Sequence, residues 1–280
     1  MKYKGGVRMK AALLQMSISD DKEKNIKKAV SFLMQAKKEN ADIAILPEMF
    51  CCPYATQNFP LYAENQGGIA WQALSQTAKK CNMYIVGGSM PEEENGAIYN
   101  TCYVFDREGK QIAKHRKMHL FDIDVAGGQC FKESDTFTAG NEITVFDTEF
   151  GKIGVCICYD IRFPELARLM VLEGAGIMIV PAAFNMTTGP AHWEILFRTR
   201  ALDNQIYTIG VAPARNNNAE YVSYGNSISV SPWGEVLTRL AEKEDIAFCN
   251  IDLDNINKVR QELPLLLHRR KDIYTIKRKE

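Results

Sequence analysis

The chain has 280 residues, of which 46% are hydrophobic, so it can bury a substantial core as one large domain or two small ones. Its 34 basic and 34 acidic side chains cancel, which gives no electrostatic field that would favour nucleic acid or an anionic membrane as a partner. No apolar run is long enough to cross a bilayer and no signal-peptide core begins the chain, so we expect a cytoplasmic protein whose 8 cysteines stay reduced.

Strand-like and helix-like segments alternate along the chain. The expected single strands are residues 10–16, 42–46, 83–87, 177–180 and 207–212, and the expected helices are 21–40, 69–81, 164–173, 191–204 and 252–261. Turn residues join three more strand pairs as hairpins, namely 98–106 with 111–115, 144–148 with 152–156, and 227–231 with 235–239. This mixture predicts an α/β fold with mixed sheets. We expect one domain over residues 1–280, with 1–8 as an N-terminal extension and 263–280 as a tail that packs on a partner subunit or stays loose.

Cys158 lies where an expected strand gives way to an expected helix, in the run GVCICYDIRFPE over residues 154–165. A thiol at such an elbow is held out of the sheet near free backbone N–H groups, which favours the thiolate and offers donors to an oxyanion. The alternative is a small buried core residue, as most free cysteines are. The polar residues directly after it favour a nucleophile. Its base would be His192, if the fold brings that ring near, or equally a glutamate acting beside a lysine.

Two more polar residues directly follow expected strands. Glu48, in the run LPEMF, has apolar neighbours that would raise its pKa toward general-base duty, and its alternative is a solvated residue after a proline turn. Lys117, in HRKMHLFD, could stabilise a negative oxygen, and its alternative is a basic surface turn. His115 and His119 are spaced like metal ligands, but no third ligand is apparent, so structural hydrogen bonds are expected of them and no metal site is predicted.

Taken in order, these three runs resemble the nitrilase superfamily of carbon–nitrogen hydrolases, and the similarity spans about residues 9–252. The resemblance implies a four-layer αββα sandwich with two mixed β-sheets, whose subunits pair by stacking their helical layers into a homodimer or higher homo-oligomer. It implies that Glu48, Lys117 and Cys158 are catalytic, with a second acidic residue, Glu133, beside them. Cys156 departs from the family, in which glycine is common at this position, and we expect it to pack in the core.

Within the superfamily, the runs at 51–54, 119–125 and 184–194 resemble the omega-amidase (Nit2-type) branch. This resemblance implies that water hydrolyses the terminal amide of a small dicarboxylate monoamide, such as 2-oxoglutaramate or 2-oxosuccinamate, through a cysteine thioester and without a cofactor. Lys117 and the backbone N–H of Tyr159 would hold the oxyanion.

Three residues are expected to bind the substrate. Arg162 could bind a carboxylate through two parallel hydrogen bonds, with further bonds from Tyr54 and Thr188. The alternative for Arg162 is an ion pair with Asp160 or Glu165.

Other functions remain open from the sequence. Within the superfamily they are hydrolysis of deaminated glutathione, hydrolysis of an N-carbamoyl compound, and, with less support, of a nitrile. From other classes they are a catalytically silent binding protein that keeps the fold, and a redox protein with a Cys156–Cys158 or Cys51–Cys52 disulfide, the second of which would be strained.

Overall fold

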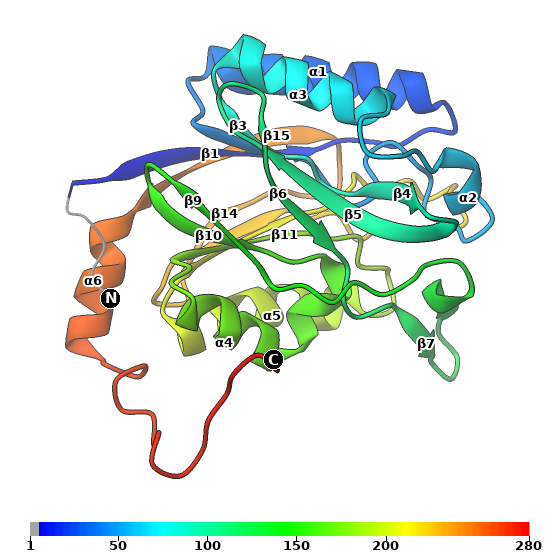
Figure 1. The fold of residues 1–280 in the computed structure, drawn as a ribbon. Helices are drawn as coiled ribbons and strands as arrows, with labels where there is room; N and C mark the ends of the chain where they lie inside the picture. Colours follow the sequence, from blue (N-terminus) through cyan, green and yellow to red (C-terminus); the bar gives the residue numbers. More distant parts are fainter. Residues whose placement is uncertain (1–5, 280) are drawn as a thin grey trace.

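Two β-sheets packed face to face form the centre of the molecule, and helices cover the outer face of each sheet (Figure 1). The computed structural model describes residues 6–279. The first sheet has the strand order β15 (Asp245–Asp252), β1 (Arg8–Gln15), β2 (Ile43–Ile45), β3 (Tyr84–Val86), β5 (Ala97–Phe105) and β4 (Met90–Glu94), with β6 (Gln111–Arg116) also paired to β5. The second sheet has the order β14 (Val236–Arg239), β13 (Ile228–Val230), β12 (Tyr207–Val211), β11 (Ile177–Pro181), β10 (Gly151–Val155) and β9 (Thr144–Thr148). Both sheets mix parallel and antiparallel pairs, so the predicted αββα sandwich is confirmed.

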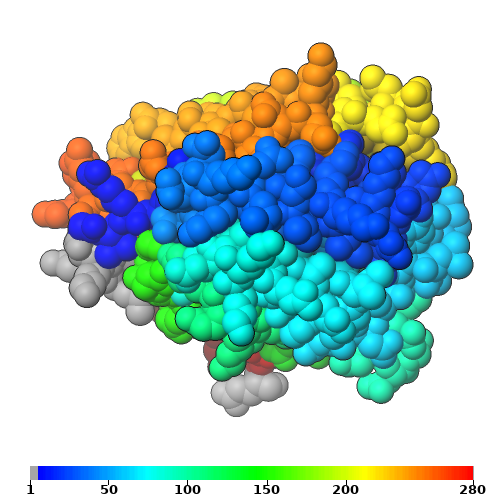
Figure 2. Space-filling view, turned by 90° about the horizontal axis from the view of Figure 1, so that it is seen from above, coloured from blue at the N-terminus to red at the C-terminus, as the bar shows by residue number. Residues whose placement is uncertain are grey.

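Helices α1 (Lys22–Lys38) and α3 (Ile69–Cys81) cover the first sheet. The side chain of Asp21 accepts a backbone N–H and so caps the start of α1. Both helices are amphipathic, and buried residues such as Leu33 and Leu74 join the outer face of the sheet in one core. Figure 2 shows the two helices side by side over this face of the molecule.

Helices α4 (Pro164–Leu172) and α5 (Gly189–Asn204) cover the second sheet. The two sheets share an apolar interior to which both contribute side chains, among them Leu13 and Ile45 from the first and Ile153, Ile179 and Ile209 from the second. Helix α6 (Leu253–Glu262) follows β15, and the one-turn α2 (Phe59–Tyr62) and the ribbon of β7 (Asp122–Asp124) with β8 (Cys130–Lys132) lie at the margin of the sandwich.

Every expected helix and strand is present, with ends within two residues of the prediction. The sequence reading missed α2, β4, β7, β8 and β15. Strand β4 has the sequence MPEEE, which lacks strand-forming residues, and it exists because its backbone pairs with β5. Strand β15 pairs with β1, which lies more than 200 residues earlier, along its full length.

The remaining organisational expectations have mixed outcomes. Cys156 is buried in the core as expected. In the tail, Arg278 forms an ion pair with Glu142 of the same chain. Most of the expected N-terminal extension lies outside the described residues. Over residues 6–279, none of the helices has the length and apolar character that a membrane span requires.

Candidate active site

Glu48 lies in the loop that follows β2, fully buried between the sheets. The next residue, Met49, has a φ of 52°, and its N–H donates to Ser89 Oγ at 3.1 Å. The loop after β3 approaches closely here, because Ser89 N–H donates to the carbonyl of Pro47. Gly88 permits this approach: it has a φ of 61°, and a Cβ on it would lie 2.1 Å from that carbonyl oxygen. The backbone of two strand ends therefore fixes the position of Glu48.

Lys117 directly follows β6 and is also fully buried. Its Nζ lies 3.0 Å from Glu48 Oε1 and 2.9 Å from both carboxylate oxygens of Glu133. Glu133 is held in turn by the N–H of Phe121, 2.6 Å from Oε2, and by the hydroxyl of Tyr54, which donates to Oε1 at 2.7 Å. One ammonium thus joins two buried carboxylates whose residues are far apart in the sequence.

Cys158 lies at the sharp turn between β10 and α4, as the sequence predicted. It is the first residue of a 3₁₀ turn, Cys158–Arg162, and its φ of 47° is unusual for a residue with a side chain. The residue is only 4% exposed, and its thiol contacts the carboxylate of Glu48 and the N–H of Ala183. Glu48, Lys117, Glu133 and Cys158, here called the polar quartet, therefore meet in one place.

Burial dominates the electrostatics of the polar quartet. It raises the pKa of Glu48, more than the neighbouring Lys117 lowers it. Burial also raises the pKa of Cys158, and the charge of Glu48 adds to that effect, so the resting thiol is neutral. The expectation that the elbow favours a thiolate was therefore wrong. Burial acts to lower the pKa of Lys117, but Glu133 and Glu48 outweigh it and raise the pKa, so the ammonium stays charged.

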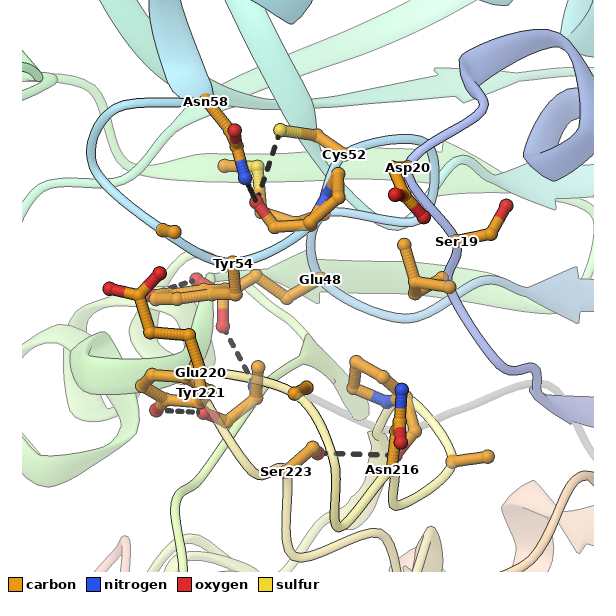
Figure 3. A pocket seen from close by; sticks show the side chains of 18 of the residues that line it. Ser19, Asp20, Glu48, Cys52, Tyr54, Asn58, Asn216, Glu220, Tyr221 and Ser223 are labelled. Carbon is orange, nitrogen blue, oxygen red and sulfur yellow. Dashed lines mark hydrogen bonds between the residues drawn. The ribbon is translucent and has the colours of Figure 1, made fainter.

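A cavity of about 390 Å³ reaches Glu48 from the surface (Figure 3). Tyr54 and Tyr221 line it with their rings 4.4 Å apart, and Ser19 and Asp20 lie across from them. The same two tyrosines also line a neighbouring cavity of about 580 Å³ under the β7–β8 ribbon. The two tyrosine rings thus line both cavities, and the smaller of the two reaches Glu48.

Arg162 lies one turn beyond Cys158, with its guanidinium 4.7 Å above the ring of Phe184. Its Nη1 lies 3.1 Å from Nδ1 of His192, and its buried Nε has no hydrogen-bond partner within the described part of the chain. No carboxylate among residues 6–279 forms an ion pair with Arg162, so the alternative of a pair with Asp160 or Glu165 was wrong. His192 meets Arg162 and does not serve as the base of Cys158.

The other two expected substrate-binding residues have protein partners. The hydroxyl of Tyr54 belongs to the polar quartet's hydrogen bonds, since it donates to Glu133. Thr188 precedes α5, and both its N–H and its hydroxyl bond Oδ1 of Asn185, at 2.8 and 3.0 Å. The neighbouring Thr187, which the sequence reading passed over, lines the larger cavity.

Asp160 is the centre of a second buried polar cluster. Its Oδ2 lies 3.1 Å from Nε2 of His115 and accepts the N–H of Ile157 at 3.0 Å, while its Oδ1 accepts the N–H of His119 and lies 2.7 Å from the ring Nδ1 of that residue. The histidines thus have the expected structural hydrogen bonds. Over residues 6–279, no three or more His, Cys, Asp or Glu side chains are grouped so that they could hold a metal ion. This cluster ties the turn that carries Cys158 to the segment that carries Lys117.

Two neighbours of Glu48 were missed by sequence reasoning. Asn100 Nδ2 donates to Oε1 at 2.9 Å, and the N–H of Ala183 donates to Oε2 at 2.7 Å. Asn100 could have been found from the sequence, because it is a polar residue within the largely apolar strand β5. A backbone donor such as that of Ala183 leaves no signal in the residue type.

Comparison with known proteins agrees with this geometry. Residues 10–261 match the carbon–nitrogen hydrolase family. The omega-amidase NIT2 of Homo sapiens is 46% identical over 269 residues, which cover 96% of this chain and 98% of that protein. The omega-amidase NIT2 of Mus musculus is 47% identical over 269 residues, with the same coverage of 96% and 98%. The crystal structure of Saccharomyces cerevisiae Nit3, described as a member of branch 10 of the nitrilase superfamily, superposes with a TM-score of 0.88 at 40% identity, covering 96% of this chain and 100% of that one. By its sequence and its fold, the chain belongs to the carbon–nitrogen hydrolase family of the nitrilase superfamily.

Proposed function

We propose that this protein is an amidase that hydrolyses the terminal amide of small dicarboxylate monoamides, of the 2-oxoglutaramate and 2-oxosuccinamate type, to the acid and ammonia. The observation that carries the proposal is the convergence of a thiol, two carboxylates and an ammonium within contact of one another. The omega-amidase names of the relatives supply the substrate class. An intact polar quartet also argues against a catalytically silent binding protein.

The first chemical step is proton transfer from Cys158 to Glu48. Because burial raises both pKa values, the neutral thiol gives up its proton only as its sulfur attacks the amide carbon. Glu48 then delivers that proton to the leaving nitrogen, and ammonia departs from a thioester. Glu48 next takes a proton from water, the hydroxide attacks the thioester, and the acid leaves as the thiol reforms.

The negative oxygen formed in each half-reaction needs fixed donors. Lys117 supplies a permanent charge, because two carboxylates keep it protonated. The backbone N–H of Tyr159, one residue beyond the nucleophile, is the second proposed donor. Glu133 orients Lys117 and faces the amide nitrogen of the substrate. No step in this sequence uses a cofactor or a metal.

Arg162 is the proposed site for the distal carboxylate of the substrate. Its guanidinium has no carboxylate partner among the described residues, its Nε is unpaired, and it lies close enough to influence the charge of Cys158. Arg162→Lys keeps the charge but loses the planar pair of donors. We expect KM for dicarboxylate monoamides to rise by about tenfold, with little change for neutral amides. Equal changes for both substrates would remove Arg162 from this role.

The function is tested by ammonia release from a panel of omega-amides, N-carbamoyl compounds, deaminated glutathione and nitriles. We expect 2-oxoglutaramate to be the best substrate class and Cys158→Ala to lose all detectable turnover. A panel led by an N-carbamoyl compound, with carbon dioxide released, would select the carbamoyl amidase instead. Turnover retained in Cys158→Ala would exclude the thioester route.

The context of the enzyme is also proposed. We infer a protein of one domain, because the two sheets share one core. We infer a cytoplasmic location, because all eight cysteines, which lie within the described residues, are free thiols. We infer a homodimer formed through the outer helical layer, because Leu172, Ile195 and Leu202 expose large apolar side chains there. Sedimentation of the full chain would test the dimer.

A further inference from the structure

Asn100 is a fully buried residue of β5 that contacts two members of the polar quartet, Glu48 and Lys117. Its side-chain Nδ2 donates to Glu48 Oε1 at 2.9 Å, and its backbone carbonyl accepts the N–H of Lys117 at 2.9 Å. The same residue therefore touches the carboxylate and fixes the start of the segment that carries the ammonium.

The side-chain amide of Asn100 is only half satisfied. Its Oδ1 is buried and has no hydrogen-bond partner within the described residues, which costs free energy in a protein interior. Turning the amide over would set Oδ1 against the carboxylate of Glu48, acceptor against acceptor. The structure thus keeps a donor on Glu48 and leaves an oxygen unpaired.

The two carboxylate oxygens of Glu48 have different surroundings. Oε1 accepts from Asn100 at 2.9 Å and from Lys117 at 3.0 Å, while the Tyr54 hydroxyl, which donates to Glu133, lies 3.4 Å away. Oε2 accepts one backbone N–H, from Ala183 at 2.7 Å. The same N–H neighbours the thiol of Cys158, which also contacts the carboxylate of Glu48, and from this shared neighbour we infer that Oε2 lies on the side of the sulfur.

We propose that Asn100 is a positioning residue that, with Lys117, reserves Oε1 of Glu48 as a pure acceptor and leaves Oε2 to take and return the proton of Cys158. A proton on Oε1 would point at the donors of Asn100 and Lys117, whereas a proton on Oε2 can point at the sulfur. This assignment of different roles to Oε1 and Oε2 rests on the proposed function, in which Glu48 is the base.

The proposal has a consequence that a purely structural residue would not have. A donor to a carboxylate favours its charged form, so removing the donor raises the pKa of Glu48. The charged form is the active base, so kcat/KM should then fall at a higher pH than in the wild type. Because Asn100 does not face the cavity, kcat should fall while KM changes little.

The test uses Asn100→Leu, which keeps the approximate volume and removes both the donor and the unpaired oxygen. We expect the acid limb of kcat/KM for ammonia release to move up by about one pH unit. Asn204→Leu is the matched control, because Asn204 is also fully buried with an unpaired Oδ1 but lies at the end of α5. The control should leave the limb in place.

A second readout separates this proposal from the amidase proposal. The rate at which iodoacetamide alkylates Cys158, followed by mass spectrometry of its peptide, reports Glu48-assisted deprotonation without any turnover. We expect its acid limb to shift in Asn100→Leu as the limb of kcat/KM does. If no amide is hydrolysed but this limb shifts, Asn100 keeps its role and the amidase proposal fails.

Asn100→Asp supplies the answer if the leucine variant does not fold. It keeps the shape and replaces the donor by a second carboxyl group, so the acid limb should move further in the same direction. An unshifted limb in a folded Asn100 variant, or an equal shift in Asn204→Leu, would overturn the proposal.

Discussion

Glu48 and Asp160 are both buried carboxylates in segments that follow strand ends, β2 and β10, yet their pKa values move in opposite directions. Burial raises the pKa of each. At Asp160 the hydrogen bonds from His115 and His119 and the N–H of Ile157 outweigh that effect and hold the pKa well below its usual range. At Glu48 the neighbouring donors do not outweigh burial, because the charge of Lys117 is shared with Glu133 and the next neighbour, Cys158, is a neutral thiol.

The difference teaches how to tell a reactive carboxylate from a structural one in this fold. A structural carboxylate such as Asp160 has donors on both oxygens that together outweigh its burial. Glu92 follows the same rule: burial acts to raise its pKa, but Arg116, Thr101 and Lys114 lower it to about 2. A reactive carboxylate is left partly uncompensated, so that it can hold a proton during the reaction.

The largest effect in this comparison is expected from Glu48→Gln. The amide keeps the shape but cannot accept the proton of Cys158, so kcat should fall by about 10²- to 10⁴-fold. Ammonia release measured near neutral pH checks this. A variant with near wild-type kcat would show that Glu48 belongs with Asp160 as a structural residue.

Lys117→Met is expected to have the next largest effect. It removes the charge that faces the developing oxyanion, which should lower kcat by roughly 10²- to 10³-fold. It also leaves Glu48 and Glu133 without their shared cation, so the pKa of Glu48 should rise further. The kinetic and thermal-unfolding measurements are made together, and a loss of stability with unchanged kcat would contradict the oxyanion role.

Asp160→Asn should act on stability. The amide cannot accept from donors on both sides, so we expect the free energy of unfolding at neutral pH to fall by about 3 kcal/mol. The folded pKa of Asp160 is lowered, so its contribution is present above the unfolded pKa of about 3.9 and is lost as the pH falls toward the folded pKa. The difference between variant and wild type, measured by denaturant titration, should therefore shrink below about pH 4. If the difference in free energy of unfolding stayed constant down to acid pH, the pKa of Asp160 would not be lowered, and the contrast with Glu48 would be wrong.

The smallest expected effect concerns the wild-type enzyme, namely the pH at which its kcat/KM begins to decline on the acid side. Burial raises the pKa of Glu48 above its ordinary 4.5, so kcat/KM should already decline above pH 4.5 as the pH falls. A pH–rate profile of 2-oxoglutaramate hydrolysis locates the limb. A limb below pH 4.5 would mean that donors dominate at Glu48 as they do at Asp160.

The order of helices and strands was readable from the sequence, because apolar periodicity and turn residues act over a few neighbouring positions. Glu48, Lys117 and Cys158 were identified together because the runs around them resemble the motifs of a known family, and each lies within three residues of the end of a strand. Residues without that local mark were missed. Strand β4 contains a proline and three glutamates, and its pairing with β5 overrides its composition.

Tertiary structure alone decided the charge states of the site residues and which residues form hydrogen bonds or ion pairs with them. The sequence placed Cys158 at an elbow, but only the packing of two sheets around it removed enough water to keep the thiol neutral. Likewise, Arg162 had carboxylates near it in sequence, but Asp160 is occupied by two histidines from another segment, and no described residue supplies the guanidinium with an acidic partner. Local sequence determined where reactive groups leave their strands, whereas desolvation and competition for donors depend on segments that only the folded chain brings together.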